Sequence, residues 1–271
     1  MRKFAVVTTF HEKGLKQYGQ KMINTFCNMW PEEVTLHIYP ELCNPAISNH
    51  NHVTLKRLEE LEDLMKFKER WKNVPKANGD VSNDPVRSKR RDAGKGFKWD
   101  AVRFAHKVYA IFHCAQETDA DVLFWMDADM ICHSPITMEI INSLVPEDKD
   151  LCFLGREGKF SECGLYSMNL RSVRTQLFLQ RFQQYYDDAE NGIFTLDEWH
   201  DSFVFDAVRK TMSLNELNWS AGLIKGEGHP LINSQWGAYL DHLKGKRKEY
   251  GKSLKEDLVV NRNENYWAEK Q

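Results

Sequence analysis

The sequence lacks the features that mark disulfide-rich, zinc-ribbon and membrane-spanning proteins. None of its six cysteines belongs to a C-x-x-C pair, so neither a zinc ribbon nor a disulfide framework is indicated. No apolar stretch approaches the length that a membrane span requires. The apolar run in MRKFAVVTTF is also too short for a secretory signal. We therefore expect a cytoplasmic protein with no membrane span.

The sequence also lacks a strong excess of charge of either sign. Its 37 lysines and arginines nearly balance 39 aspartates and glutamates, for a formal net charge of −2. No overall attraction to nucleic acid or to an anionic membrane is therefore expected. With 42% hydrophobic residues over 271 positions, the chain is long enough to bury a large α/β core.

The hydrophobic pattern predicts alternating strands and helices. An apolar run at 3–10, a helical period at 14–30 and a second strand at 33–40 form a βαβ unit, which favours a parallel sheet. Residues 72–96 are rich in Gly, Pro, Asn and charge, and predict a long surface loop. The other expected helices are 52–71, 97–117, 173–188 and 196–211. The other expected strands are 121–126, 150–155 and 164–170.

Two aspartates, Asp127 and Asp129, follow the most apolar of these strands in the stretch FWMDADM. Open α/β sheets bind ligands at the carboxyl ends of their strands. Two carboxylates there offer the hard oxygen ligands that Mg²⁺ or Mn²⁺ prefers when it holds a diphosphate. The structural alternative is that either aspartate only caps a helix or a turn.

A second motif, H-x-x-G-x-x-K, lies near the end of the chain at His242, Gly245 and Lys248. The imidazole offers a third metal ligand and favours Mn²⁺ over Mg²⁺, while the glycine and lysine suit a phosphate. The alternative is a helix C-terminus with a solvated basic tail. His133 and His229 are rival third ligands.

Together the two motifs resemble those of the glycogenin-like (family eight) retaining glycosyltransferases, which have the GT-A fold. The resemblance implies a Rossmann-like α/β fold with a mixed, mostly parallel sheet flanked by helices. It implies one domain over 1–271, with a nucleotide-sugar-binding half at 1–130 and an acceptor-binding half, including a basic C-terminal segment, at 131–271. The implied metal ligands are Asp127, Asp129 and His242. The residues implied to contact the nucleotide are Thr8, Thr9, Phe10, Asp127, Gly245 and Lys248.

Weaker matches and departures bear on the chemistry. Asp201 occupies the place of a family aspartate that contacts the donor sugar. However, Glu162 stands where the family has asparagine, and Ser202 stands where it has the glutamine nearest the anomeric carbon. The absence of this glutamine counts against transfer with retention. His242 follows SQWGAYLD, which is compatible with a helix, whereas the family's histidine follows a strand. Glu249 and Tyr250 replace the family's Pro-Trp.

The resemblance implies transfer of a hexose from a nucleotide sugar, most simply a UDP-sugar, to an acceptor hydroxyl with retention. Lys98 and Arg103, on the expected helix before the aspartates, would add positive charge near the donor phosphates. Asp201 would stabilise the sugar's developing charge or orient the acceptor. If the enzyme inverts, Asp201 or Glu198 is the natural general base.

The acceptor is left open by the sequence, as a glycan or as a hydroxymethylated DNA base. The basic stretches 86–98 and 244–255 are compatible with contact to a nucleic-acid backbone. A non-enzymatic nucleic-acid-binding module is therefore one alternative function. A metal-dependent phosphohydrolase or nucleotidyltransferase using the same aspartates is another. The sugar and the oligomeric state are not indicated.

Overall fold

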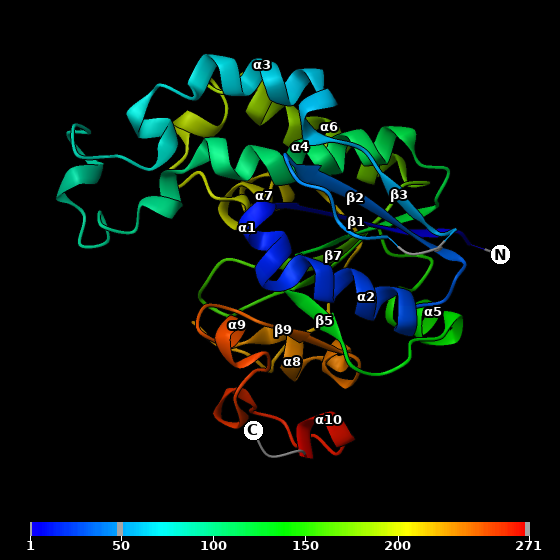
Figure 1. The fold of residues 1–271 in the computed structure, drawn as a ribbon. Coiled ribbons are helices and arrows are strands. Elements are labelled where there is room, and N and C mark those ends of the chain that lie inside the picture. Colours follow the sequence, from blue (N-terminus) through cyan, green and yellow to red (C-terminus); the bar gives the residue numbers. More distant parts are fainter. Residues whose placement is uncertain (1, 48–50, 269–271) are drawn as a thin grey trace.

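The computed structural model describes residues 2–47 and 51–268, which form a seven-stranded sheet in the order β3-β2-β1-β4-β7-β6-β8 (Figure 1). Four of the six strand pairs are parallel, and both pairs that involve β7 are antiparallel. This confirms the expected α/β class with a mixed, mostly parallel sheet. The strands are β1 (Phe4–His11), β2 (Val34–Glu41), β3 (Val53–Leu55), β4 (Val122–Met126), β6 (Leu151–Leu154), β7 (Glu162–Asn169) and β8 (Glu216–Asn218).

Helices cover both faces of this sheet (Figure 1). Side chains alternate along β1, so that Val6 packs with Phe26 in one core and Val7 packs with Val108 in the other. The first face is covered by α2 (Gln20–Met29) and α5 (Met138–Leu144). The second is covered by α3 (Glu62–Trp71), α4 (Ala101–Glu117), α6 (Val173–Asp187) and α7 (Asp201–Arg209). Within the described ranges, no helix is long and apolar enough to cross a bilayer.

Short helical turns connect these elements. A π-helical turn at Leu15–Gly19 links α1 (Glu12–Gly14) to α2. The remaining short α-helices are α8 (Pro230–Asn233), α9 (Arg247–Tyr250) and α10 (Asn265–Ala268). The 3₁₀ turns are Leu58–Glu60, Pro75–Asn78, Arg87–Lys89, Gly96–Trp99, Ile193–Thr195, Gln235–Ala238 and Lys255–Asp257.

A second, two-stranded sheet lies beside the ends of the main one. Its strands are β5 (Met130–Cys132) and β9 (Leu240–His242), which run antiparallel with Met130 opposite His242. The segment before His242, which the sequence left compatible with a helix, therefore ends in a strand. Leu240 is fully buried and pairs with Cys132, and this long-range pairing outweighs the local helical pattern.

Three expected helices begin later than the sequence pattern indicated. The region 52–71 starts with strand β3, because Val53 and its β-branched neighbour extend the sheet edge beside β2. Helix α4 starts after Asp100, whose side chain accepts a hydrogen bond from the Arg103 N–H. Helix α7 likewise starts after the capping residue His200 and not at 196. Both caps place polar groups at helix N-termini beside the sheet edge.

Candidate metal and donor site

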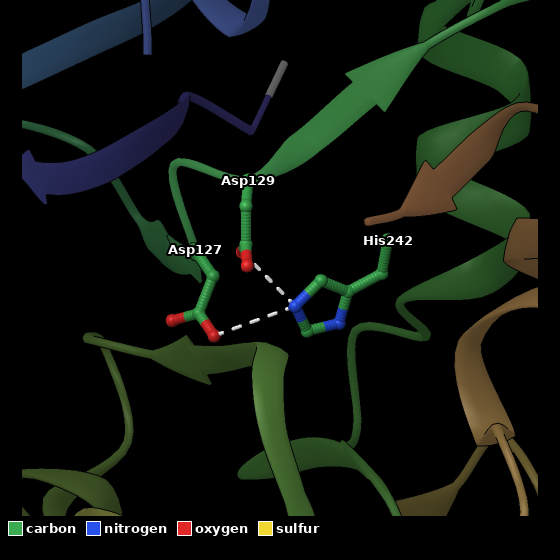
Figure 2. Close-up of side chains that lie close together, drawn as sticks. All are labelled: Asp127, Asp129 and His242. Carbon is green, nitrogen blue, oxygen red and sulfur yellow. Dashed lines mark ion pairs between the residues drawn. The ribbon is translucent and has the colours of Figure 1, made fainter. Parts of the chain in front are cut away.

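Strand β4 carries the paired aspartates to the edge of the sheet. All five of its residues are buried, and the chain then turns sharply, with the Met130 N–H donating to the Asp127 carbonyl at 3.1 Å. The Asp127 N–H donates to the Gly164 carbonyl on β7 at 2.8 Å, which fixes the start of this turn. As a result, the carboxylates of Asp127 and Asp129 face the same space (Figure 2). Asp127 pairs with Lys107, and Asp129 pairs with His242.

His242, the last residue of β9, completes this group (Figure 2). Its Nε2 lies 3.0 Å from Asp129 Oδ1 and 3.7 Å from Asp127 Oδ2. One ligand atom from each of the three residues lies within 4.8 Å of the others. The His242 side chain is 3% exposed and that of Asp127 is 31% exposed, so the group is buried behind and open in front. Two carboxylates and an imidazole form a donor set that suits a divalent cation such as Mn²⁺.

A second layer of residues holds the His242 ring. Glu162, the first residue of β7, places Oε1 2.6 Å from His242 Nδ1 and Oε2 2.6 Å from Lys244 Nζ. Gly164 supplies the room for the ring, since a Cβ at this position would lie 2.6 Å from His242 Cε1. The sequence marked Glu162 only as a departure from the family pattern, and the structure shows its partners.

Burial and charge pairing oppose each other across this group. Burial raises the pKa of Asp127, and Lys107 only partly offsets it. For Asp129, burial is outweighed by His242 and Lys248, which hold its pKa well below the usual range. Burial also disfavours a charged His242, but Asp129 and Glu162 outweigh it and raise the pKa of His242 to about 9. The cluster therefore carries both signs of charge in close contact.

Lys107 of α4 is a buried cation at the centre of the site, and sequence reasoning missed it. Its Nζ lies 3.1 Å from Asp127 Oδ1 and 2.5 Å from Asp201 Oδ2, and it also donates to the Cys163 carbonyl. The ammonium lies 4.5 Å from the centre of the Trp125 ring. The available signal was its spacing of four residues from Arg103, which places both cations on one side of a helix.

Lys248 of α9 contacts the other aspartate of the ligand group, Asp129, whereas Lys107 contacts Asp127. Its Nζ lies 2.8 Å from Asp129 Oδ2 and 4.8 Å from the centre of the Tyr18 ring. Gly245 adopts a left-handed φ of 56°, which turns the chain between β9 and α9. The H-x-x-G-x-x-K motif therefore does not end a long helix. It places both His242 and Lys248 against Asp129.

A pocket of about 320 Å³ opens in front of these residues, within the size range of small-molecule sites. Thr9, Phe10 and Arg103 line it as expected, whereas Thr8 is fully buried within β1 and lies outside the lining. The five lysines and arginines of the wall are Arg103, Lys107, Arg156, Lys244 and Lys248. The five carboxylates of the wall are Glu41, Asp127, Asp129, Glu162 and Asp201. With His242 protonated as well, the wall therefore has little excess of positive charge of its own.

Two expected site residues lie elsewhere. Lys98 is in a 3₁₀ turn before α4, and its Nζ lies 2.7 Å from Glu198 Oε1 and 2.6 Å from Asp92 Oδ2. Glu198 Oε2 lies 2.9 Å from His200 Nε2. Lys98 and Glu198 line a neighbouring cavity and not the pocket that contains the aspartates. The sequence placed them near the site by position along the chain, but their ion pairs draw them together.

The rival histidines also lie outside the ligand group. The His133 ring stacks on Tyr266 at 3.9 Å, with its Nδ1 2.9 Å from Ser134 Oγ. His229 lies behind the site, with its Nε2 2.9 Å from the carbonyl oxygen of His242. Burial lowers the pKa of His229 to about 4, so that it is neutral near pH 7. Of the three histidines, His242 alone presents a ring nitrogen to both aspartates.

The basic surface segments are partly neutralised by the protein itself. Arg87 pairs with Asp84 at 3.0 Å, and Arg90 pairs with Asp92 at 3.0 Å. Arg90 also contacts Glu198. The first two contacts lie within the expected loop, and the contact with Glu198 ties the loop to another part of the chain. They reduce the charge that it offers to a nucleic-acid backbone.

No protein-family model matches the sequence, and no curated protein matches it either. Among solved structures, the chain is similar to the apo form of the bifunctional glycosyltransferase WbbM, with a TM-score of 0.46 and 8% identity over 81% of this chain and 39% of that one. It is similar to the apo form of glycosyltransferase GlyE of Streptococcus pneumoniae TIGR4, with a TM-score of 0.43 and 11% identity over 80% of this chain and 46% of that one. It is also similar to apo mouse xyloside xylosyltransferase 1, with a TM-score of 0.40 and 10% identity over 77% of this chain and 81% of that one.

The chain spans less than half the length of WbbM and of GlyE. At TM-scores below 0.5 these likenesses carry no argument about activity. Function is therefore argued from the geometry of the site.

Proposed function

We propose that this protein is a metal-dependent glycosyltransferase that uses a nucleotide sugar, with UDP-sugar as the first donor to test. The proposal rests chiefly on the convergence of Asp127, Asp129 and His242 at the end of β4, inside a pocket. Lys107 and Lys248 flank this group, each within 3.1 Å of one of the aspartates. Clustered carboxylates and cations in a crevice at a sheet edge suit a metal–diphosphate pair.

The charge of the pocket supports a requirement for metal. Its five lysines and arginines are matched by five carboxylates, so that a diphosphate entering alone would meet little net attraction. A divalent cation bound by Asp127, Asp129 and His242 would add positive charge to this pocket, even though His242 releases its proton to bind the ion. When bound, such an ion supplies positive charge at the leaving diphosphate. The imidazole in the set favours Mn²⁺ over Mg²⁺, which prefers oxygen ligands.

The remaining wall residues have distinct proposed roles. Thr9 and Phe10 at the end of β1 would contact the nucleoside, while Arg103 and Lys248 would face the phosphates. Asp201, at the first position of α7, would accept a hydrogen bond from a hydroxyl of the donor sugar. Its pairing with Lys107 keeps its carboxylate directed at the pocket.

For the acceptor, we propose a hydroxyl of a glycan and not a DNA base. The internal ion pairs of Arg87 and Arg90 leave less free positive charge for a nucleic-acid backbone than the sequence indicated. Retention of the anomeric configuration is proposed from the family resemblance. Ser202, in place of the family's glutamine, lines the pocket and makes the product's configuration, read by proton NMR, an essential measurement.

The test is acceptor-independent cleavage of a panel of UDP- and GDP-sugars by the purified protein with Mn²⁺. Asp129→Asn removes a proposed ligand, and Asp257→Asn is a matched control. Asp257 is 12% exposed and pairs with Arg247, whereas Asp129 is 13% exposed and pairs with Lys248. Free nucleoside diphosphate, inorganic phosphate and pyrophosphate are measured separately.

We expect slow, EDTA-sensitive release of nucleoside diphosphate from one sugar nucleotide, lost in Asp129→Asn and kept in Asp257→Asn. Release of inorganic phosphate from phosphomonoesters would instead indicate a phosphohydrolase, and pyrophosphate formed from a nucleoside triphosphate and a sugar phosphate would indicate a nucleotidyltransferase. No turnover together with no donor-induced change in Tm would refute a donor site here.

A further inference from the structure

Glu162 is a buried carboxylate that touches the proposed metal site without belonging to its ligand set. Its side chain is 4% exposed and lies between two cations, with Oε1 2.6 Å from His242 Nδ1 and Oε2 2.6 Å from Lys244 Nζ. It lies at the start of β7, within the main sheet. Burying a carboxylate is costly unless its oxygens are paired, and here both are.

The contact with His242 bears on which ring nitrogen can bind a metal ion. A histidine that binds a metal through one nitrogen carries its proton on the other, and the partner of that proton fixes the tautomer and the ring's orientation. When a metal ion is bound, an Nδ1–H that donates to Glu162 would leave the Nε2 lone pair for the ion, on the side of the ring that faces Asp127 and Asp129. Gly164, two residues further along β7, leaves the space that the ring needs in this orientation.

We propose that Glu162 is a positioning residue of the metal site, which holds His242 in the Nδ1–H tautomer with Nε2 presented to the metal ion. This inference rests on the proposed function in one respect, since it takes Asp127, Asp129 and His242 as the ligands. Glu162 itself does not touch the metal. Its second oxygen, held by Lys244, keeps the carboxylate from turning away.

The test measures binding of Mn²⁺ alone, by electron paramagnetic resonance of the free ion at fixed pH, without donor or turnover. The variants are Glu162→Gln, His242→Ala and Glu198→Gln. Glu198 is a matched control because it is also a buried glutamate, 5% exposed, between a histidine and a lysine in another cavity. Glutamine keeps the size of the side chain but removes its charge.

Loss of a carboxylate that orients a metal-binding histidine typically weakens metal affinity 10- to 100-fold. We expect the Kd for Mn²⁺ to rise by about this factor in Glu162→Gln, and to stay within threefold of wild type in Glu198→Gln even if both variants lose a similar amount of Tm. A Kd within threefold of wild type in Glu162→Gln, with binding lost in His242→Ala, would overturn the positioning role alone. Unchanged binding in His242→Ala would instead overturn the metal site.

A second measurement needs no substitution at Glu162, so it stands even if Glu162→Gln does not fold. In the ¹⁵N-labelled wild-type protein, NMR of the His242 ring with Zn²⁺ reports which nitrogen carries the proton. We expect a protonated Nδ1 and a metal-bound Nε2. A metal-bound Nδ1, or a proton on Nε2, would overturn the proposal.

Discussion

Replacing Lys107 with methionine tests whether the buried ammonium stabilises the paired carboxylates. Lys107 is 9% exposed and pairs with Asp201, whose side chain is 12% exposed, and with the more open Asp127. Removing one partner of a buried ion pair costs about 3–5 kcal/mol, because the remaining charge is left uncompensated. Methionine keeps contact with the Trp125 ring, which recovers part of this loss.

We therefore expect Lys107→Met to lower the free energy of unfolding by about 3–4 kcal/mol at pH 7.5. For a chain of this size that corresponds to a fall in Tm of roughly 6–16 °C. Scanning calorimetry of the metal-free protein gives the comparison. Arg103→Met is the control, since Arg103 lies one turn earlier on α4 and is exposed, and its loss is expected to cost within about 0.5 kcal/mol.

Addition of Mn²⁺ gives a second reading of the same reasoning. A cation at the proposed site places positive charge beside Asp127, so Mn²⁺ should raise the Tm of Lys107→Met by more than it raises that of wild type. A metal-free deficit no larger than that of Arg103→Met would refute the view that Lys107 compensates buried carboxylates. An equal gain in Tm from Mn²⁺ in both proteins would show that Lys107 and the metal ion do not compensate the same carboxylates.

Two further predictions concern catalysis and pH. Asp201→Asn should lower kcat for donor cleavage about 100-fold while the Kd for Mn²⁺ changes less than threefold, because Asp201 lies in the pocket but outside the ligand group. Steady-state kinetics and metal titration measure these two quantities. An unchanged kcat would show that Asp201 has no part in the mechanism. Burial lowers the pKa of His133 to about 4 from 6.5. The unfolded chain therefore binds a proton at His133 before the folded protein does, and stability falls as pH drops from about 6.5 to 4, by up to about 3 kcal/mol. His133→Phe, which keeps the stacking on Tyr266, should flatten the dependence of Tm on pH in this window, and an unchanged slope would contradict this assignment.

The sequence alone predicted the fold class and one part of the site. Apolar runs and helical spacing are local properties, so the strands at β1, β2 and β4 and the parallel βαβ unit were recognisable without contacts. The position of Asp127 and Asp129 directly after an apolar strand predicted that both would lie at the sheet edge, and they do. Helix starts were less accurate, because a cap such as Asp100 competes with the apolar pattern on either side.

Only the tertiary structure decided which other residues join the aspartates. His242 reaches them because β9 pairs with β5, a contact between distant segments that the local sequence pattern does not show. Lys107 and Glu162 become recognisable only when α4 and β7 bring their charges against Asp127 and His242. Lys98 and Glu198, which the sequence placed in the site, instead pair with each other beside it. Local patterns determine where helices and strands form. A buried charge is strongly destabilising unless it is paired, and the packing of distant elements determines which residue is its partner.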